Sequence, residues 1–91
     1  MARPKKHRKC NCNPEANYFK PRGIPLRELK EVELEKDELE AIKLADYDGL
    51  AQEEAAIKMG ISRQTFGRIV KSARLKIASA LLNGNALKIN E

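Results

Sequence analysis

The fold of this chain is decided by residues 52–82, which read QEEAAIKMGISRQTFGRIVKSARLKIASALL. Apolar residues recur there every three or four positions, a spacing that predicts two amphipathic helices. Gly60 separates them, because glycine readily takes the positive φ that ends one helix and begins a sharp turn. Ser62 can cap the second helix, since its hydroxyl can accept a hydrogen bond from an amide of the first turn. The stretch therefore predicts a helix-turn-helix.

The sizes of the apolar side chains fit two helices that cross closely. Ala56 is small where the helices would meet, and Ile61 can fill the corner between them. Phe66 and Ile69 are spaced to pack into the remaining gap, with Ala55 and Met59 alongside. These residues therefore form the predicted core of the motif.

The polar residues that follow Ser62 would lie on the outer face of the second helix. A recognition helix presents its N-terminal side chains to base edges in the major groove of DNA. Arg63 and Arg68 could each bind guanine through two hydrogen bonds, and Gln64 could bind adenine in the same way. The alternative is that they are ordinary solvated side chains. Further along the helix, cationic side chains could contact phosphate or only favour solubility: Lys71, Arg74 and Lys76.

Gly67 is unexpected within this helix. Glycine in a helix interior costs about 1 kcal/mol relative to alanine. Either the helix approaches the backbone of a partner at Gly67, or it packs there against the neighbouring helix. The sequence leaves both open.

Charge is distributed unevenly along the chain. The formal net charge of +5 combines +7 over residues 1–30, −8 over residues 31–54 and +6 over residues 55–91. We expect residues 1–15 to form a basic flexible arm and residues 16–91 to form the helix-turn-helix domain. Arg3, Lys5 and Lys6 of the arm could contact DNA phosphates or a minor groove, or could form a solvated tail. The acidic middle would face away from DNA or would bind a protein partner.

The remaining signals predict neither a metal site, nor a cofactor, nor an enzyme. His7, Cys10 and Cys12 could supply three metal ligands, but a structural zinc site normally uses four, so we expect two free thiols. The acidic residues from Glu31 to Glu54 would be spread over exposed faces, without the cleft that catalysis needs. No apolar run reaches the roughly 20 residues of a membrane helix, and no secretory signal begins the chain, so we expect a cytoplasmic protein without membrane contact.

Shorter elements are expected around the motif. Asp37, with Glu40 three residues later, would cap a helix over residues 37–45. Val32 and Leu34 alternate with acidic residues, and two apolar residues alternate similarly over 87–90, which predicts two short strands paired antiparallel with glutamates facing Lys88. Before them, five residues would pack an extended lid and one helical turn on the core: Tyr18, Phe19, Ile24, Leu26 and Leu29. The expected class is all-α, with three or four helices and room for one two-stranded terminal β-pair.

Residues 52–77 resemble the helix-turn-helix in the C-terminal region of sigma factors, which binds the upstream promoter element. Over nearly its whole length the chain more closely resembles a small uncharacterised prokaryotic family of predicted DNA-binding proteins. The stretches that carry this second resemblance are NYFKP (17–21), PLREL (25–29), DELEA (37–41) and SRQTFGR (62–68). The resemblance implies that Arg63, Gln64 and Arg68 face the groove, and that Ser62 and Thr65 lie near phosphates.

Together these signals predict sequence-specific binding of double-stranded DNA by a transcriptional regulator. One helix reads only a few base pairs, so useful specificity favours a homodimer on two half-sites. Leu81 and Leu82 could form the dimer contact or pack inward. The alternative function is a protein-interaction module in which the acidic segment 31–54 docks a partner such as RNA polymerase.

Overall fold

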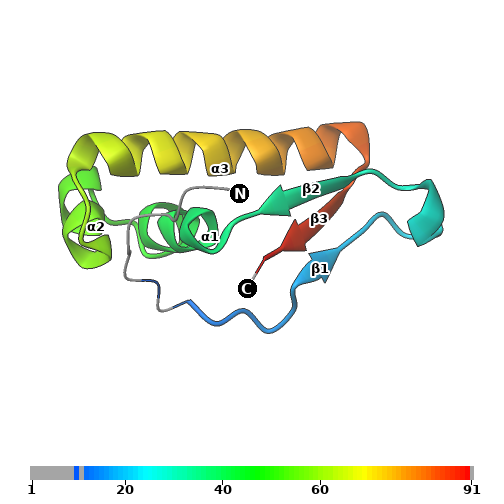
Figure 1. Cartoon of the computed structure of the whole chain (residues 1–91), viewed down its shortest axis with the longest axis horizontal. Helices are drawn as coiled ribbons and strands as arrows, with labels where there is room; N and C mark the ends of the chain where they lie inside the picture. Colours follow the sequence, from blue (N-terminus) through cyan, green and yellow to red (C-terminus); the bar gives the residue numbers. More distant parts are fainter. Residues whose placement is uncertain (1–9, 11, 91) are drawn as a thin grey trace, which may run out of the picture.

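The described part of the chain forms three α-helices and one small three-stranded sheet, and the sheet packs against α3 (Arg63–Asn83), the longest helix (Figure 1). The computed structural model describes residues 10 and 12–90. In chain order the elements are β1 (Tyr18–Phe19), the 3₁₀ turn η1 (Leu26–Glu28), β2 (Glu31–Leu34), α1 (Lys36–Ile42), the π-helical segment η2 (Lys43–Tyr47), α2 (Gln52–Met59), α3 (Arg63–Asn83) and β3 (Ala86–Ile89). The expected all-α class is therefore confirmed only in part. Most of the regular structure is helical, but β1, β2 and β3 form a sheet that the class does not include.

The turn between α2 and α3 has the predicted geometry. Gly60 adopts φ +67° and ends α2, and the N–H of Ile61 donates to the carbonyl of Ala56 at 3.0 Å. Ser62 is the N-cap of α3, and its Oγ accepts a hydrogen bond from the N–H of Thr65 at 3.1 Å. The start of α3 is thus fixed by its own capping residue.

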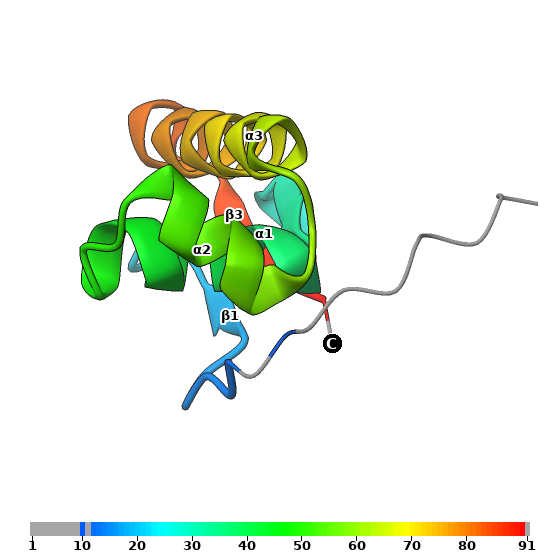
Figure 2. The same ribbon diagram turned by 90° about the vertical axis from the view of Figure 1, so that its left-hand side faces the viewer.

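The long helix α3 is the spine of the molecule. Its 21 residues extend for about 30 Å at 1.5 Å per residue. Figures 1 and 2 show α1 and α2 beneath its N-terminal half and the sheet beneath its C-terminal half. Gly84 follows its last residue, Asn83, and ends it with φ +65°.

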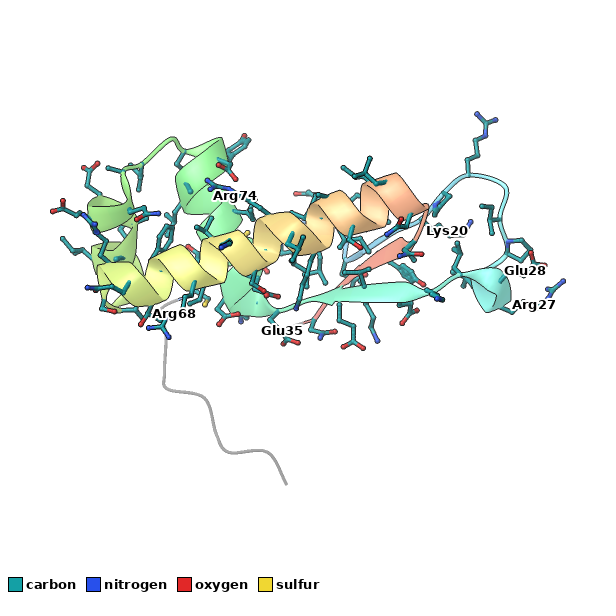
Figure 3. The ribbon with its side chains drawn as sticks, turned by 90° about the horizontal axis from the view of Figure 1, so that it is seen from above. Lys20, Arg27, Glu28, Glu35, Arg68 and Arg74 are labelled. Atoms are coloured by element: carbon teal, nitrogen blue, oxygen red, sulfur yellow. The ribbon has the colours of Figure 1, made fainter. Side chains whose placement is uncertain are left out.

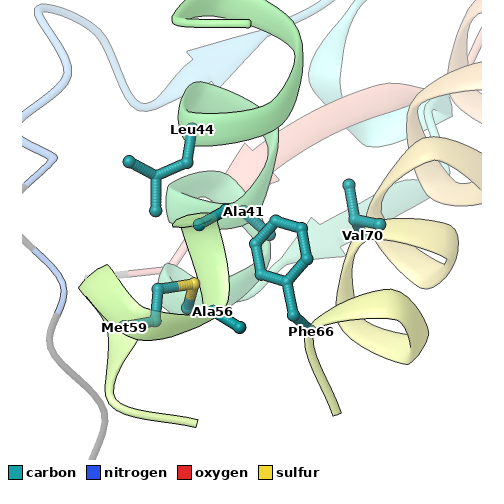
Figure 4. Packing of buried hydrophobic residues seen from close by; sticks show 7 residues of the cluster. Ala41, Leu44, Ala56, Met59, Phe66 and Val70 are labelled. Atoms are coloured by element: carbon teal, nitrogen blue, oxygen red, sulfur yellow. The ribbon is translucent and has the colours of Figure 1, made fainter. Parts of the chain in front are cut away.

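The first hydrophobic cluster joins the three helices. Phe66, which is fully buried, lies at its centre between α2 and α3 (Figure 4). The other buried members are Ala41, Leu44, Ala55, Ala56, Met59 and Val70. The predicted motif residues Ala55, Ala56, Met59 and Phe66 are all buried, and Ile61 and Ile69 pack against them.

A second, smaller cluster joins α3 to the sheet. Leu34, Ala73 and Ile89 are its buried residues, and Ile42 packs against both clusters. Val70 of the first cluster and Ala73 of the second lie one turn apart on α3. The two clusters therefore share one helix.

The expected antiparallel pairing of the two short strands is wrong. β2 and β3 pair in parallel, with Glu33 opposite Lys88, so the glutamate does neighbour the lysine although the strand direction differs. Parallel strands need a long crossover, and the helices between Leu34 and Ala86 provide it. The third strand was not predicted: Tyr18–Phe19 form β1, antiparallel to β3, which gives the order β1-β3-β2.

The expected lid over residues 16–31 is only partly correct. Its helical turn is η1, but Phe19, Ile24 and Leu26 are exposed instead of packed on the core. Tyr18 is half-buried, and its hydroxyl donates to Glu31 Oε2 at 2.6 Å. This segment is held by strand pairing more than by buried side chains.

The N-cap of the first helix lies two residues earlier than the sequence predicts. Glu35, not Asp37, is the N-cap, and Glu38, not Glu40, completes the capping box by accepting from the N–H of Glu35 at 2.8 Å. The α-helix ends at Ile42, and the expected span to residue 45 continues as the wider π-helical η2.

Candidate nucleic-acid interface

The first turns of α3 present polar side chains opposite the buried ones. Arg63, Gln64, Arg68 and Lys71 are exposed, whereas Phe66 and Val70 of the same turns are buried. Successive residues of a helix are rotated by 100°, so Gln64, Arg68 and Lys71 share the face that points away from the core. Figure 3 shows Arg68 extending outward from this end of α3.

Two hydroxyl side chains lie together at the start of this face. Ser62 Oγ, which accepts from the Thr65 amide, also donates to Thr65 Oγ1 at 2.9 Å. Thr65 is half-buried and Ser62 is exposed. These two hydrogen bonds between Ser62 and Thr65 fix the orientation of the helix start.

The cations of this face are weakly held by the protein itself. Arg63 approaches Glu53 of α2 only at 3.9 Å, and both side chains are largely exposed. Such an exposed contact contributes little to stability. Neither Arg68 nor Lys71 has an ion-pair partner within residues 10 and 12–90. These three side chains are therefore available to bind an anion.

Arg74, by contrast, is engaged with the body of the protein. Its Nε and Nη2 donate to the two carboxylate oxygens of Asp46 in η2, at 3.1 and 2.7 Å. This bidentate pair raises the pKa of Arg74 and lowers the pKa of Asp46. Arg74 therefore fastens η2 to α3.

Lys76 is also used by the fold. Its Nζ donates to Glu38 Oε1 at 2.7 Å and to the carbonyl oxygen of Glu33 at 2.9 Å. Glu38 is buried, and its second oxygen accepts from Ser72 Oγ at 2.7 Å. Burial alone would raise the pKa of Glu38, but the hydrogen bonds from Lys76, Ser72 and the Glu35 amide outweigh it and lower that pKa. Lys71, Arg74 and Lys76 were the cations expected to contact phosphate or to be solvated. Of these, only Lys71 is not bound to a carboxylate within the described residues.

The acidic segment is less exposed than the sequence suggested. Asp37, Glu38 and Glu40 are buried, so the expectation that all its carboxylates lie on exposed faces is wrong. Glu40 Oε1 accepts from the N–H of Cys12 at 2.7 Å. Much of the negative charge in residues 31–54 therefore holds the fold together.

Gly67 lies beside the N-terminus of α2. A Cβ atom placed on it would meet Nε2 and Oε1 of Gln52 at 3.7 and 3.9 Å, which is ordinary van der Waals contact. Gln52 is the first residue of α2, and its position against α3 depends on the crossing of the two helices.

Several of the predicted sites fall outside the described residues. Arg3, Lys5, Lys6 and His7 belong to this part of the chain, so their contact with DNA or with a metal stays a prediction. Cys10 packs against the first cluster. The pKa of Cys12 is raised, mainly because the thiol is partly buried and to a smaller extent because the Glu40 carboxylate is near it. A raised pKa disfavours the thiolate that binds metal. Among the described residues no group of three or more metal-ligating side chains is found.

The far end of α3 carries exposed apolar side chains. Leu81 and Leu82 are 78% and 86% exposed, so the inward packing considered for them does not occur. Leu81 and Phe19 border an apolar groove of about 530 Å³ between the end of α3 and the sheet. No helix in the described part of the chain is long and apolar enough to cross a membrane.

Comparison with known proteins gives a family for this fold. Residues 1–91 match the family described as "Protein of unknown function DUF134". The chain belongs to this family. Its relatives include UPF0251 proteins of Halothermothrix orenii, 56% identical over 97% of this chain, and of Vibrio cholerae, 52% identical over 98%.

The DUF134 relatives differ in length from this chain. It spans 65% of the Halothermothrix orenii protein and 64% of a UPF0251 protein from Desulfosudis oleivorans, but 91% of the Vibrio cholerae protein. No solved structure matches the chain. The match over residues 1–91 and these relatives place the chain in the DUF134 family.

Proposed function

We propose that this DUF134 protein binds double-stranded DNA in a sequence-specific manner, as a cytoplasmic transcriptional regulator whose recognition helix is the N-terminal half of α3. The proposal rests on one observation: the cations of this helix fall into two groups with different environments. Arg63, Arg68 and Lys71 are exposed and at most loosely paired, whereas Arg74 and Lys76 are bound to carboxylates of the fold. A helix start with free cations and a capped, rigid backbone suits the major groove.

The turn and the core support this proposal. α2 and α3 meet at a glycine turn with positive φ, and Phe66 between them holds the crossing. The similarity to the helix-turn-helix of the sigma-factor C-terminal region is part of the proposal. In it, Arg63, Gln64 and Arg68 bind base edges, and Ser62, Thr65 and Lys71 lie near phosphates. The arm residues Arg3, Lys5 and Lys6 would add phosphate contacts.

A pair of subunits would extend the recognised site. One helix reads about three or four base pairs, so we include in the proposal a homodimer on two half-sites. The exposed Leu81 and Leu82 are the candidate contact.

The test is equilibrium binding to duplex fragments selected from random DNA, compared with an unselected duplex of equal length. Selected fragments should bind at least about a thousandfold more tightly. The logarithm of the affinity should fall with the logarithm of salt concentration with a slope of about −3 or steeper, because at least three cations would displace counterions. A slope near zero, or equal affinity for selected and unselected duplexes, would contradict the proposal.

A second candidate function has its own observation. Tyr47 and Ile57 are 86% and 76% exposed, and Ile57 lies one helical turn from the acidic Glu53 and Glu54. Aromatic and aliphatic side chains beside acids could dock a basic protein surface such as one on RNA polymerase. In that case Tyr47→Ala with Ile57→Ala should abolish capture of polymerase and leave DNA binding unchanged. Capture unaffected by both changes would exclude this surface.

A further inference from the structure

Gly67 is the one glycine for which the described fold gives no backbone reason. Four glycines adopt positive φ, a conformation that other residues rarely take: Gly23, Gly49, Gly60 and Gly84. Gly67 is not among them, because it lies within the regular helix α3. Its conformation would suit alanine, which forms helices more readily.

The space around Gly67 would also admit a methyl group. The nearest atoms to a Cβ there are the carboxamide atoms of Gln52, at 3.7 and 3.9 Å. Gln52 is exposed, so its side chain has room to adjust. Packing against α2, one of the two explanations left open by the sequence, therefore does not require glycine. The remaining explanation is a close approach from outside the chain.

Gly67 lies among the free cations of the candidate interface. It follows Arg63 by four residues, precedes Lys71 by four, and is adjacent to Arg68. Residues four apart lie above one another on a helix. Arg63 and Lys71 therefore lie about one helical turn to either side of Gly67, at which the half-buried backbone of α3 carries no side chain.

We propose that Gly67 is the position where duplex DNA comes closest to the axis of α3. The missing side chain would let a base edge or a sugar–phosphate strand contact the helix backbone, while Arg63, Arg68 and Lys71 reach the nucleotides around that point. This inference rests on the proposed function, because it assigns the closest contact of the same interface.

The test combines two measurements on Gly67→Ala. Its melting temperature should rise by about 4–8 °C, because the alanine fits the fold and favours the helix. Its affinity for duplex DNA should fall by about tenfold, because the methyl group occupies the space of the ligand. Gly67→Leu should bind more weakly still. The control is Ala78→Gly, an exposed site further along α3, which should lower the melting temperature and leave the affinity unchanged.

The choice of DNA separates the two possible contacts. An equal loss on selected and unselected duplexes assigns the contact to the sugar–phosphate strand, and a loss confined to selected duplexes assigns it to a base edge. A lower melting temperature for Gly67→Ala would show that the fold itself requires glycine, and undiminished affinity would show that DNA does not approach there. Either result overturns the inference. Failure of the wild-type protein to bind duplex DNA would overturn the proposed function as well, and is seen without any variant.

Discussion

Arg68 and Arg74 lie on the same helix, but the structure gives them different environments. Arg68 extends into solvent from the first turns of α3, while Arg74 is bound to both oxygens of Asp46 (Figure 3). From the sequence alone, both are basic residues of one helix. The difference arises because η2 returns the chain to α3 and brings a carboxylate to one arginine only.

This difference makes a matched pair of variants for testing base recognition. Arg68→Ala should cost about 1–3 kcal/mol on selected duplexes and much less on unselected ones, because a bidentate contact to guanine is lost. Arg74→Ala should leave DNA affinity nearly unchanged, because its guanidinium is occupied by Asp46. Lys5→Ala with Lys6→Ala should weaken binding to all sequences alike. Competition binding measures all three, and equal losses in selectivity for the two arginine variants would refute this division of roles.

The residues of the turn were the most predictable part of the site. Gly60 and Ser62 act through their own backbone and the next three residues, so local sequence is enough to place them. Partners distant in the chain were not predictable. Lys76 meets Glu38, and Cys12 meets Glu40, only because separate elements pack together.

At the scale of elements, the buried Glu38 links α1, α3 and the strand before them. It accepts from Lys76 and Ser72 of α3 and closes the capping box with Glu35. The sequence pattern around residues 35–40 is rich in acids, so several capping boxes were possible. The box at Glu35 is formed because β2 ends at Leu34 and the chain must turn into α1 immediately.

The stability of the protein should therefore depend on the ionisation of Glu38. Its folded-state pKa lies below the ordinary value of 4.5. Stability from this carboxylate is fully present above that ordinary value and is lost as pH falls through the lower pKa of the folded state. Glu38→Gln should be destabilised by about 2 kcal/mol at neutral pH, and the difference from wild type should shrink as the medium becomes acidic.

Urea unfolding at several pH values measures this effect. Glu54→Gln, the same change at an exposed acid of α2, serves as the control and should match the wild type throughout. A destabilisation by Glu38→Gln that persists undiminished in acid would show that side-chain shape, and not charge, is responsible.

At the scale of the whole molecule, the two hydrophobic clusters are joined through α3 and Ile42. A destabilising substitution in the sheet should therefore also destabilise the helical end of the molecule. Helices and the turn were predicted from periodicity and capping. The parallel direction of β2 and β3, and the participation of Tyr18–Phe19 in the sheet, were not predicted, because four-residue strands carry no signal of direction and a two-residue strand carries almost none.

Leu34→Ala tests the coupling of the two clusters. Leu34 is 1% exposed in β2, so the change should cost about 2–5 kcal/mol. Leu75→Ala, the same substitution at a 70% exposed residue of α3, should cost almost nothing. Amide hydrogen exchange should then accelerate together in α2 and β3 of the Leu34 variant. Faster exchange confined to the sheet would show that the clusters unfold independently.

Because α3 contributes residues to both hydrophobic clusters, its packing affects how the protein binds a ligand. Because the helix is anchored along its length, its first turns have little freedom to lose when a ligand docks against them. The entropic penalty of ordering, which is large for flexible recognition segments, should therefore be small here. Affinity would then be set mainly by how well the surfaces and charges match, and the protein would meet its partner as a rigid body.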